Sequence, residues 1–266
     1  MEIELEKVGI DRSKKIISIS SLNPLVAFVN ESVFDVCKKI SDSLHRSIPV
    51  VDKKFNLKGI VTITDIFNLF FSEWEMNLPI QLVMSKEVVS CEENETIEYV
   101  LEKMKISKRG RLPVLSINKV VGIVSETDFI LSIKNFESLE NIRIDEFMVK
   151  KPFFIPPTFT IKDVMRTMVN TKYRRLPIVE NGKLVGYITS TLLFKRLVEN
   201  SFSNMFLSKN VSEVMVRNPI TSNKYDSLGN VLRKMRENKI SSMLIVSDEN
   251  KLEGIFTERD FINLLI

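Results

Sequence analysis

Four stretches of this 266-residue chain share one pattern: LKGIVTITD (57–65), VVGIVSETD (120–128), LVGYITSTL (184–192) and LEGIFTERD (252–260). Each has apolar residues around a glycine, then a hydroxyl residue and, in three of the four copies, an aspartate three positions later. The glycines recur after 63, 64 and 68 residues, at Gly59, Gly122, Gly186 and Gly254. A period of this length indicates one supersecondary unit repeated along the chain. The chain is therefore a fourfold repeat.

In each copy, one predicted helix and two predicted strands precede this pattern in the sequence. Apolar residues at i, i+3, i+4 and i+7 share one helix face. They predict four buried stripes: Val33, Val36, Cys37 and Ile40; Ile97, Val100, Leu101 and Met104; Ile161, Val164, Met165 and Met168; Leu228, Val231, Leu232 and Met235. A strand is predicted after each stripe, at SIPVV (47–51), RLPVL (111–115), RLPIV (175–179) and SMLIV (242–246). A short strand is predicted before each stripe, near Val26, Ser90, Phe154 and Thr221.

Turns and lead-in segments complete the unit. A polar turn such as Glu180-Asn181-Gly182-Lys183 joins the two central strands of a copy. Three copies also share a lead-in that ends in methionine, at Met84, Met148 and Met215. Each unit therefore reads β-α-β-β-α, and the fold class is α+β. Cys37 lies on a core stripe, so we expect a buried free thiol there.

This order and spacing resemble the CBS domain, a family named after cystathionine β-synthase, over nearly the whole chain. In that family two repeats pack through their sheets into one tandem module. A unit of about 60 residues buries too little surface to be stable alone, so pairing is also expected on size. The resemblance implies two tandem modules with ligand clefts between paired repeats: residues 1–138, with repeats at about 16–72 and 80–134, and residues 139–266, with repeats at about 144–200 and 211–266.

The hydroxyl residues Thr62, Ser125, Thr189 and Thr257 each stand between a strand and a predicted helix. A hydroxyl there caps the first N–H groups of the helix, and an acidic residue three positions later completes a capping box. The same geometry also suits a ligand, because unpaired N–H groups and the helix dipole attract phosphate. The resemblance implies that these hydroxyls, with Asp65, Asp128 and Asp260, hold the ribose and phosphate of an adenosine nucleotide. Both interpretations stay open here.

The resemblance also implies further ligand contacts. Ser90 and Thr221 match the position where a hydroxyl meets adenosine, and the basic residues Arg109, Arg111 and Arg175 match a segment that contacts phosphate. Arginine can bind phosphate in a bidentate manner. The copies differ, since repeat 3 has Leu192 in place of the aspartate, and repeat 4 has Ser241-Ser242 and Leu244 in place of the arginines and proline. Repeat 2 departs least and is the first choice for an occupied site.

Composition and charge indicate a globular protein that does not span a membrane. The content of hydrophobic residues is 44%, which suffices for packed cores. No apolar run approaches the roughly 20 residues that span a bilayer, and no signal-like stretch opens the chain, so we expect a cytoplasmic protein without membrane contact. Residues 1–141 carry 18 Lys and Arg against 21 Asp and Glu, whereas residues 142–266 carry 20 against 13. The basic second half is either an uneven solvated surface or attracts an anionic partner.

No motif for a nucleotide-hydrolysing, dinucleotide-binding, serine-nucleophile or zinc-protease site occurs, so no enzyme and no required cofactor is expected. His45 is the only histidine, which excludes a cluster of histidine ligands for a metal. We expect a regulatory sensor of AMP, ADP or ATP that signals to a protein partner, similar in architecture to the four-repeat gamma subunit of AMP-activated protein kinase. S-adenosylmethionine, NADH or a cyclic dinucleotide would fit the same residues, and dimerisation is left open.

The sequence leaves two alternatives to the sensor open. A nucleic-acid-binding protein is suggested by the basic half, although no helix-turn-helix, zinc finger or aromatic RNA-binding strand supports it. A protein-only scaffold, in which the pockets no longer bind a ligand, is the other. Titration with ATP, ADP and AMP separates the sensor from the scaffold, and a salt-dependent shift assay with DNA or RNA tests the first alternative.

Overall fold

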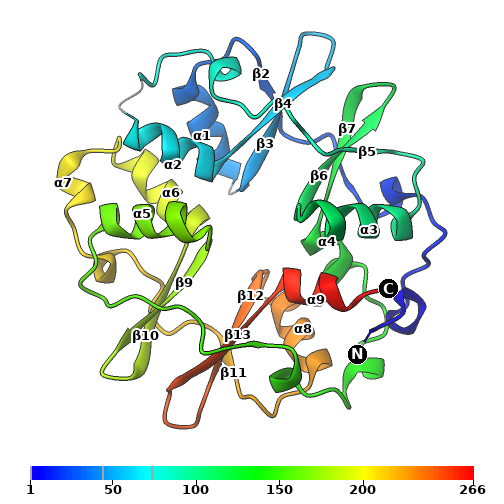
Figure 1. The fold of residues 1–266 in the computed structure, drawn as a ribbon, viewed down its shortest axis with the longest axis vertical. Coiled ribbons are helices and arrows are strands. Elements are labelled where there is room, and N and C mark those ends of the chain that lie inside the picture. The colour runs from blue at the N-terminus through cyan, green and yellow to red at the C-terminus, as the bar shows by residue number, and fades with distance from the viewer. Residues whose placement is uncertain (1, 44, 73–74) are drawn as a thin grey trace. The chain divides into compact units, whose positions relative to one another are not determined.

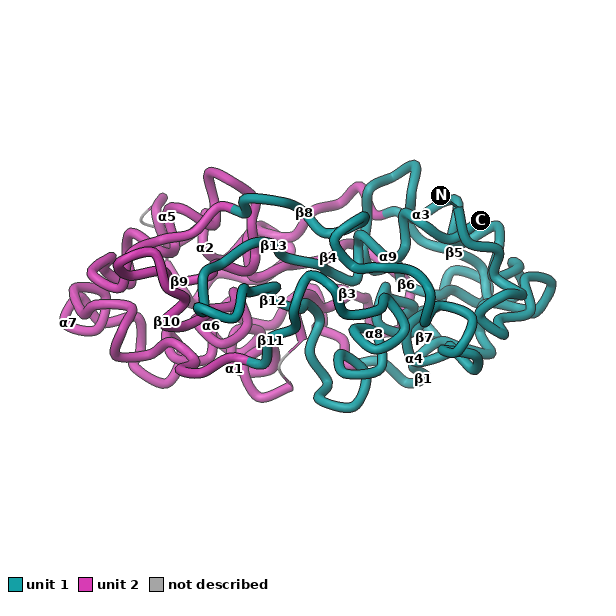
Figure 2. The backbone as a smooth tube through the Cα atoms, turned by 90° about the horizontal axis from the view of Figure 1, so that it is seen from below, with its two compact units in different colours: residues 1–24, 89–152, 220–266 teal, residues 25–88, 153–219 magenta. Residues whose placement is uncertain are grey.

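A computed structural model describes residues 2–43, 45–72 and 75–266 of the chain. The helices and strands fall into two compact units, coloured separately in Figure 2. Unit 1 comprises residues 1–24, 89–152 and 220–266, and unit 2 comprises residues 25–88 and 153–219. Unit 1 contains the helices and central strands of repeats 2 and 4, and unit 2 contains those of repeats 1 and 3. The division into modules at 1–138 and 139–266 stays a prediction.

Unit 1 contains two four-stranded sheets, in the orders β1-β7-β6-β5 and β11-β12-β13-β8. In each sheet the short first strand of the repeat runs parallel to the second strand, and the two long strands are antiparallel. The elements, labelled in Figure 1, are β1 (Ser21–Leu22), β5 (Cys91–Glu92), α3 (Ile97–Ser107), β6 (Arg111–Ser116), β7 (Lys119–Ser125), α4 (Glu126–Leu131), β8 (Val149–Lys150), β11 (Thr221–Ser222), α8 (Leu228–Glu237), β12 (Ser242–Val246), β13 (Leu252–Thr257) and α9 (Glu258–Leu264).

Unit 2 is built in the same way, with sheets in the orders β2-β3-β4 and β10-β9. The first strand predicted for repeat 3 is reduced to a single bridge between Ile155 and Ile178. The turn at Asn181-Gly182 has positive φ at both residues, as a tight hairpin between β9 and β10 requires. The elements are β2 (Ala27–Phe28), α1 (Val33–Ser43), β3 (Ser47–Val51), β4 (Leu57–Thr62), α2 (Ile63–Phe71), α5 (Ile161–Thr171), β9 (Arg175–Glu180), β10 (Lys183–Thr189), α6 (Ser190–Glu199) and α7 (Asn204–Leu207).

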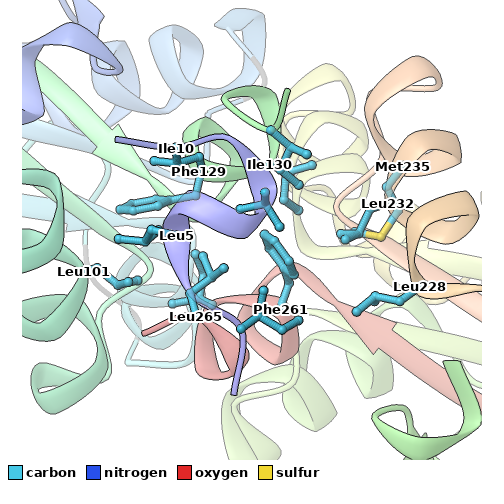
Figure 3. Packing of buried hydrophobic residues seen from close by; sticks show 14 of the residues in the cluster. Leu5, Ile10, Leu101, Phe129, Ile130, Leu228, Leu232, Met235, Phe261 and Leu265 are labelled. Carbon is cyan, nitrogen blue, oxygen red and sulfur yellow. The ribbon is translucent and has the colours of Figure 1, made fainter. Parts of the chain in front are cut away.

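The predicted helical stripes form the cores of the two units. Every residue of the four stripes is buried, on α1, α3, α5 and α8. Figure 3 shows the cluster of unit 1, in which Leu5, Leu101, Phe129, Phe261 and Leu265 gather from distant parts of the sequence. The predicted β-α-β-β-α units and the mixed α and β architecture are therefore confirmed. Burial raises the pKa of the Cys37 and Cys91 thiols to about 12, which agrees with an unreactive core thiol at Cys37.

Lead-in segments are exchanged between consecutive repeats. Strand β1, which precedes repeat 1's first strand, pairs with β7 of repeat 2, and β8 of repeat 3 pairs with β13 of repeat 4. The exchange explains the repeated glycines and methionines together. A Cβ atom at Gly254 would overlap the side chain of Met148, and Gly59 and Gly186 stand in the same relation to Met84 and Met215. At these positions a lead-in methionine occupies the space that a side chain would fill, so a larger residue would force the methionine to move.

Gly254→Ala is expected to lower the free energy of unfolding by roughly 1–3 kcal/mol, since the added methyl group meets the buried Met148. Urea unfolding followed by circular dichroism measures the loss. In the double variant Gly254→Ala with Met148→Ala, the loss should be smaller than the sum of the two single losses. Additive losses would show that the methionine is not the reason for the glycine.

The two ends of the chain pair with each other inside unit 1. The Ile3 N–H donates to Leu264 O at 2.7 Å, and the Ile266 N–H donates to Ile3 O at 2.9 Å. Ile3, Leu5 and Leu265 are fully buried in the core of that unit. Ile3 and Leu265 are thus part of the packed interior of unit 1. Within the described ranges, none of the helices combines the length and the apolar character needed to cross a membrane.

Candidate functional site

The candidate site of repeat 2 lies where strand β7 ends and helix α4 begins. Asp128 Oδ2 accepts hydrogen bonds from the Ser125 N–H and from Ser125 Oγ, both at 2.6 Å. Asp128 Oδ1 lies 3.4 Å from the hydroxyl of Ser21, on the exchanged strand β1. An ionised carboxylate has about four lone-pair sites. Capping therefore leaves Asp128 able to accept further hydrogen bonds from a ligand.

The same hydroxyl–aspartate geometry recurs in repeats 1 and 4. Thr62 Oγ1 donates to Asp65 Oδ2 at 2.8 Å, and Thr257 Oγ1 donates to Asp260 Oδ2 at 2.7 Å. Both pairs form capping boxes. In repeat 3 the Thr189 hydroxyl caps α6 by accepting from the Leu192 N–H, and Leu192 stands at the position of the aspartate. The capping interpretation is thus confirmed, and it is compatible with ligand binding at the three aspartates.

The first N–H group of each of these helices is already hydrogen-bonded, contrary to the expectation of free donors. The N–H groups of Ile63, Glu126, Ser190 and Glu258 donate to the carbonyl oxygens of Arg46, Gly110, Arg174 and Ser241. These carbonyls belong to the segments that precede the second strand of each repeat. The first N–H group of each of these helices is therefore not available to an anion.

Arg111 is the basic residue that the fold brings to the candidate site. It begins strand β6 and lies opposite Ser125 in the antiparallel pair. Burial raises the pKa of the Asp128 carboxyl, and the positive charge of Arg111 acts in the opposite direction. Arg175 lies opposite Thr189 in repeat 3 in the same register, whereas repeats 1 and 4 have Ser47 and Ser242 there. Repeat 2 alone combines the arginine with the aspartate, which supports the choice of this repeat; Arg109 is exposed beside it.

Thr221 begins β11 and Ser90 directly precedes β5, whereas the resemblance to the family places these hydroxyls at the end of the first strand. Ser90 directly precedes β5, on the other side of β6 from Ser125, so the described contacts do not join Ser90 to Asp128. Lys103 fixes this strand start, because its Nζ donates to Ser90 O at 3.3 Å and to the Glu95 carboxylate at 2.8 Å. Lys39 binds Val26 O and Glu31 in repeat 1 in the same way.

Repeat 3 departs from the other copies at three positions of this arrangement. Thr167 stands where repeats 1, 2 and 4 have a lysine that links the first strand to a carboxylate. Phe154, which replaces the hydroxyl residue at the strand start, is exposed, and Leu192 replaces the aspartate. The concerted loss of these polar groups argues against an adenosine site in repeat 3.

Asp128 differs from an ordinary capping aspartate in its burial. Asp163 closes the capping box of α5, its side chain is 43% exposed, and the Thr160 hydroxyl holds the pKa of its carboxyl below the usual value. Asp128 is only 8% exposed, and burial raises its pKa despite the Ser125 hydrogen bonds and the charge of Arg111. Capping does not require that cost, so the burial of Asp128 favours a second role for it.

The raised pKa makes the contribution of Asp128 to stability depend on pH. The contribution is fully present below the ordinary value of 3.8 and is lost as the pH rises through the folded-state pKa, because ionisation is harder in the folded protein. Asp128→Asn keeps an acceptor for Ser125 but cannot ionise. As the pH rises from about 4 to about 7, the free energy of unfolding of this variant should therefore increase relative to that of the wild type. Denaturant unfolding at both values measures the difference, and an unchanged or reversed difference would contradict the raised pKa.

Sequence reasoning missed two groups of this site. Ser21 reaches Asp128 only through the exchange of strand β1, and nothing near Ser21 in the sequence signals that contact. Glu126 and Arg259 form an ion pair between α4 and α9, from repeats 2 and 4. Both partners are visible in the repeated motif: Glu126 directly follows the cap in SETD, and Arg259 lies two residues after the cap in TERD. Within the described part of the chain, His, Cys, Asp and Glu side chains form no group suited to a metal ion.

Comparison with known proteins places the chain among relatives from archaea. It is 30% identical over 246 residues to the uncharacterized protein MJ1225 of Methanocaldococcus jannaschii, which covers 83% of this chain and 88% of the relative. The crystal structure of MJ1225, proposed as an archaeal homolog of g-AMPK, matches with a TM-score of 0.84 and 24% identity over 94% of this chain and 99% of the other.

A second solved structure has the same fold at greater distance. It is an uncharacterized conserved protein from Pyrococcus horikoshii, with a TM-score of 0.64 and 22% identity over 94% of this chain and 99% of the other. The family model of the CBS domain matches residues 16–72, 80–135, 144–199 and 211–266. These four matches follow the four repeats almost residue for residue. The chain therefore belongs to the CBS domain family and carries four copies of the domain.

Proposed function

We propose that this protein is a regulatory sensor that binds an adenine nucleotide (AMP, ADP or ATP) and signals to a partner protein by a change of conformation. The observation that carries the proposal is the buried Asp128 carboxylate. It accepts a hydrogen bond from the Ser125 hydroxyl, and Arg111 lies opposite Ser125 in the neighbouring strand. A carboxylate accepts hydrogen bonds only, so it matches the two hydroxyls of a ribose. The arginine matches a phosphate.

The proposed role is regulatory and not catalytic. The four CBS domains account for most of the chain, and the candidate site contains a capped carboxylate and arginines without a paired nucleophile and base. Binding would shift the population of conformations by the difference in affinity between them. A partner protein that recognises one conformation would read that shift.

The first experiment identifies small molecules that co-purify with the protein by mass spectrometry. Added AMP, ADP or ATP is expected to raise the melting temperature, because a ligand that binds only the folded state stabilises it. No nucleotide should be consumed above a buffer blank over several hours. Hydrolysis that disappears in the Asp128→Ala variant would overturn the regulatory role. No shift with any adenine nucleotide would favour a protein-only scaffold.

A further inference from the structure

Unit 1 buries a glutamate at the start of each of two helices. Glu126 opens α4 and Glu258 opens α9, and each side chain is 1% exposed. The equivalent positions in unit 2 carry Ile63 and Ser190. A buried carboxylate is costly unless it is paired. At the first helical position after the cap, unit 1 therefore has acidic residues, whereas unit 2 has uncharged ones.

Glu126 lies against the basic segment of repeat 2. Its Oε1 accepts from Arg259 Nε, and its backbone N–H donates to Gly110 O at 3.0 Å. A Cβ atom at Gly110 would lie only 2.6 Å from Glu126 Oε2, so the carboxylate occupies the space above this glycine. Gly110 stands between Arg109 and Arg111 in the sequence. The carboxylate thus faces the segment that would hold the phosphates.

One oxygen of this carboxylate lacks a donor. Glu126 Oε2 is buried, and no hydrogen-bond partner for it exists among the residues that the structure describes. Glu258 differs, because Thr127 Oγ1 donates to Glu258 Oε1 at 2.5 Å. Glu126 therefore has one carboxylate oxygen that can still accept a hydrogen bond next to the candidate site. Among the described hydrogen bonds and ion pairs, the only cation that contacts Glu126 is Arg259 from repeat 4.

We propose that Glu126 is a specificity-determining residue that limits the number of phosphates on the ligand of repeat 2. The inference rests on the proposed function. A nucleotide with its ribose on Asp128 and its tail on Arg109 and Arg111 brings each added phosphate towards Glu126. A phosphate that drew Arg259 away would leave Glu126 buried without its cation, which is unfavourable. The site therefore prefers a nucleoside monophosphate over a triphosphate.

The test compares AMP and ATP by calorimetry on the full chain. Asp65→Asn and Asp260→Asn are introduced first, so that Asp128 is the remaining ribose carboxylate of the repeated motif. Adding Glu126→Gln removes the charge but keeps an oxygen for Arg259. We expect ATP affinity to rise about tenfold and AMP affinity to change less than about threefold, since ATP carries more charge past the same point.

Glu140→Gln is the matched control. Glu140 is also paired with an arginine in unit 1, Arg233, but it is partly exposed. This control should leave the ratio of ATP to AMP affinity unchanged, and a ratio that moves equally in both variants would overturn a local role for Glu126. If Glu126→Gln does not fold, Arg259→Gln provides the second variant: it removes the cation that pairs with Glu126, so the ratio of ATP to AMP affinity should fall.

Two outcomes separate this inference from the proposed function. Binding of both nucleotides with an unchanged ratio in Glu126→Gln would overturn the inference and leave the sensor intact. Absence of binding by AMP and ATP in the wild type would overturn the proposed function, and the inference would fall with it. Circular dichroism melting of each variant confirms that the compared proteins are folded.

Discussion

Asp128→Ala is expected to weaken binding of adenine nucleotides by about 1.5–3 kcal/mol, whereas Leu192→Ala should change affinity far less. The estimate is the range for hydrogen bonds to a charged group, because the variant loses the carboxylate proposed to accept two ribose hydroxyls. Leu192 stands at the same position in repeat 3 and offers no acceptor there. Isothermal calorimetry with AMP and ATP measures both variants.

Asp163→Ala is the control for this prediction, since Asp163 closes an equivalent capping box on α5 and is much less buried than Asp128. Removing it should lower the melting temperature, as the loss of a cap does, without changing nucleotide affinity. If Asp128→Ala also lowers only the melting temperature, Asp128 caps α4 and has no part in binding.

Phe261→Ala is expected to lower the free energy of unfolding of unit 1 by about 3–5 kcal/mol, the usual range for a buried phenylalanine. Phe261 is fully buried on α9 and belongs to the core cluster in Figure 3. The truncation removes apolar contacts and leaves a cavity in a packed interior. Urea unfolding followed by circular dichroism gives the loss.

Ile117→Ala provides the comparison, because Ile117 is 88% exposed in the turn between β6 and β7. A change at such a surface position usually stays within about 0.5 kcal/mol. Equal losses for the two variants would show that the core of unit 1 is not closely packed around Phe261.

The repeated pattern predicts the elements well because it is local. The stripe of Ile97, Val100, Leu101 and Met104 depends only on helical spacing, and all four residues are buried on α3. The turn at Asn181-Gly182 is likewise recognisable from adjacent residues. Such features need no knowledge of distant parts of the chain.

The exchange of lead-in segments could not be predicted in this way. Met148 and Gly254 are visible as repeated residues, but their contact joins positions more than a hundred residues apart. The first strand of repeat 3 was predicted and is only a bridge at Ile155, because apolar character alone does not specify how many residues pair.

The candidate site shows the same division between local and distant information. Ser125 and Asp128 are three residues apart, so their contact follows from the start of a helix. The contact of Asp128 with Ser21 and the ion pair of Glu126 with Arg259 depend on tertiary packing. The N–H groups at these helix starts were expected to be unpaired, but the first of them donates to a carbonyl group such as Gly110 O, which only the tertiary structure reveals.

The pairing of Ile3 with Leu265 orders the steps by which the protein folds during its synthesis. All residues of unit 2 have been made once the ribosome passes residue 219, whereas unit 1 also needs Ile220–Ile266. At roughly 5–20 residues per second, the last residue of unit 1 is made several seconds after the last residue of unit 2. Until then the apolar side chains of Ile3 and Leu5, among the first to be made, lack their C-terminal neighbours in the core, such as Leu265.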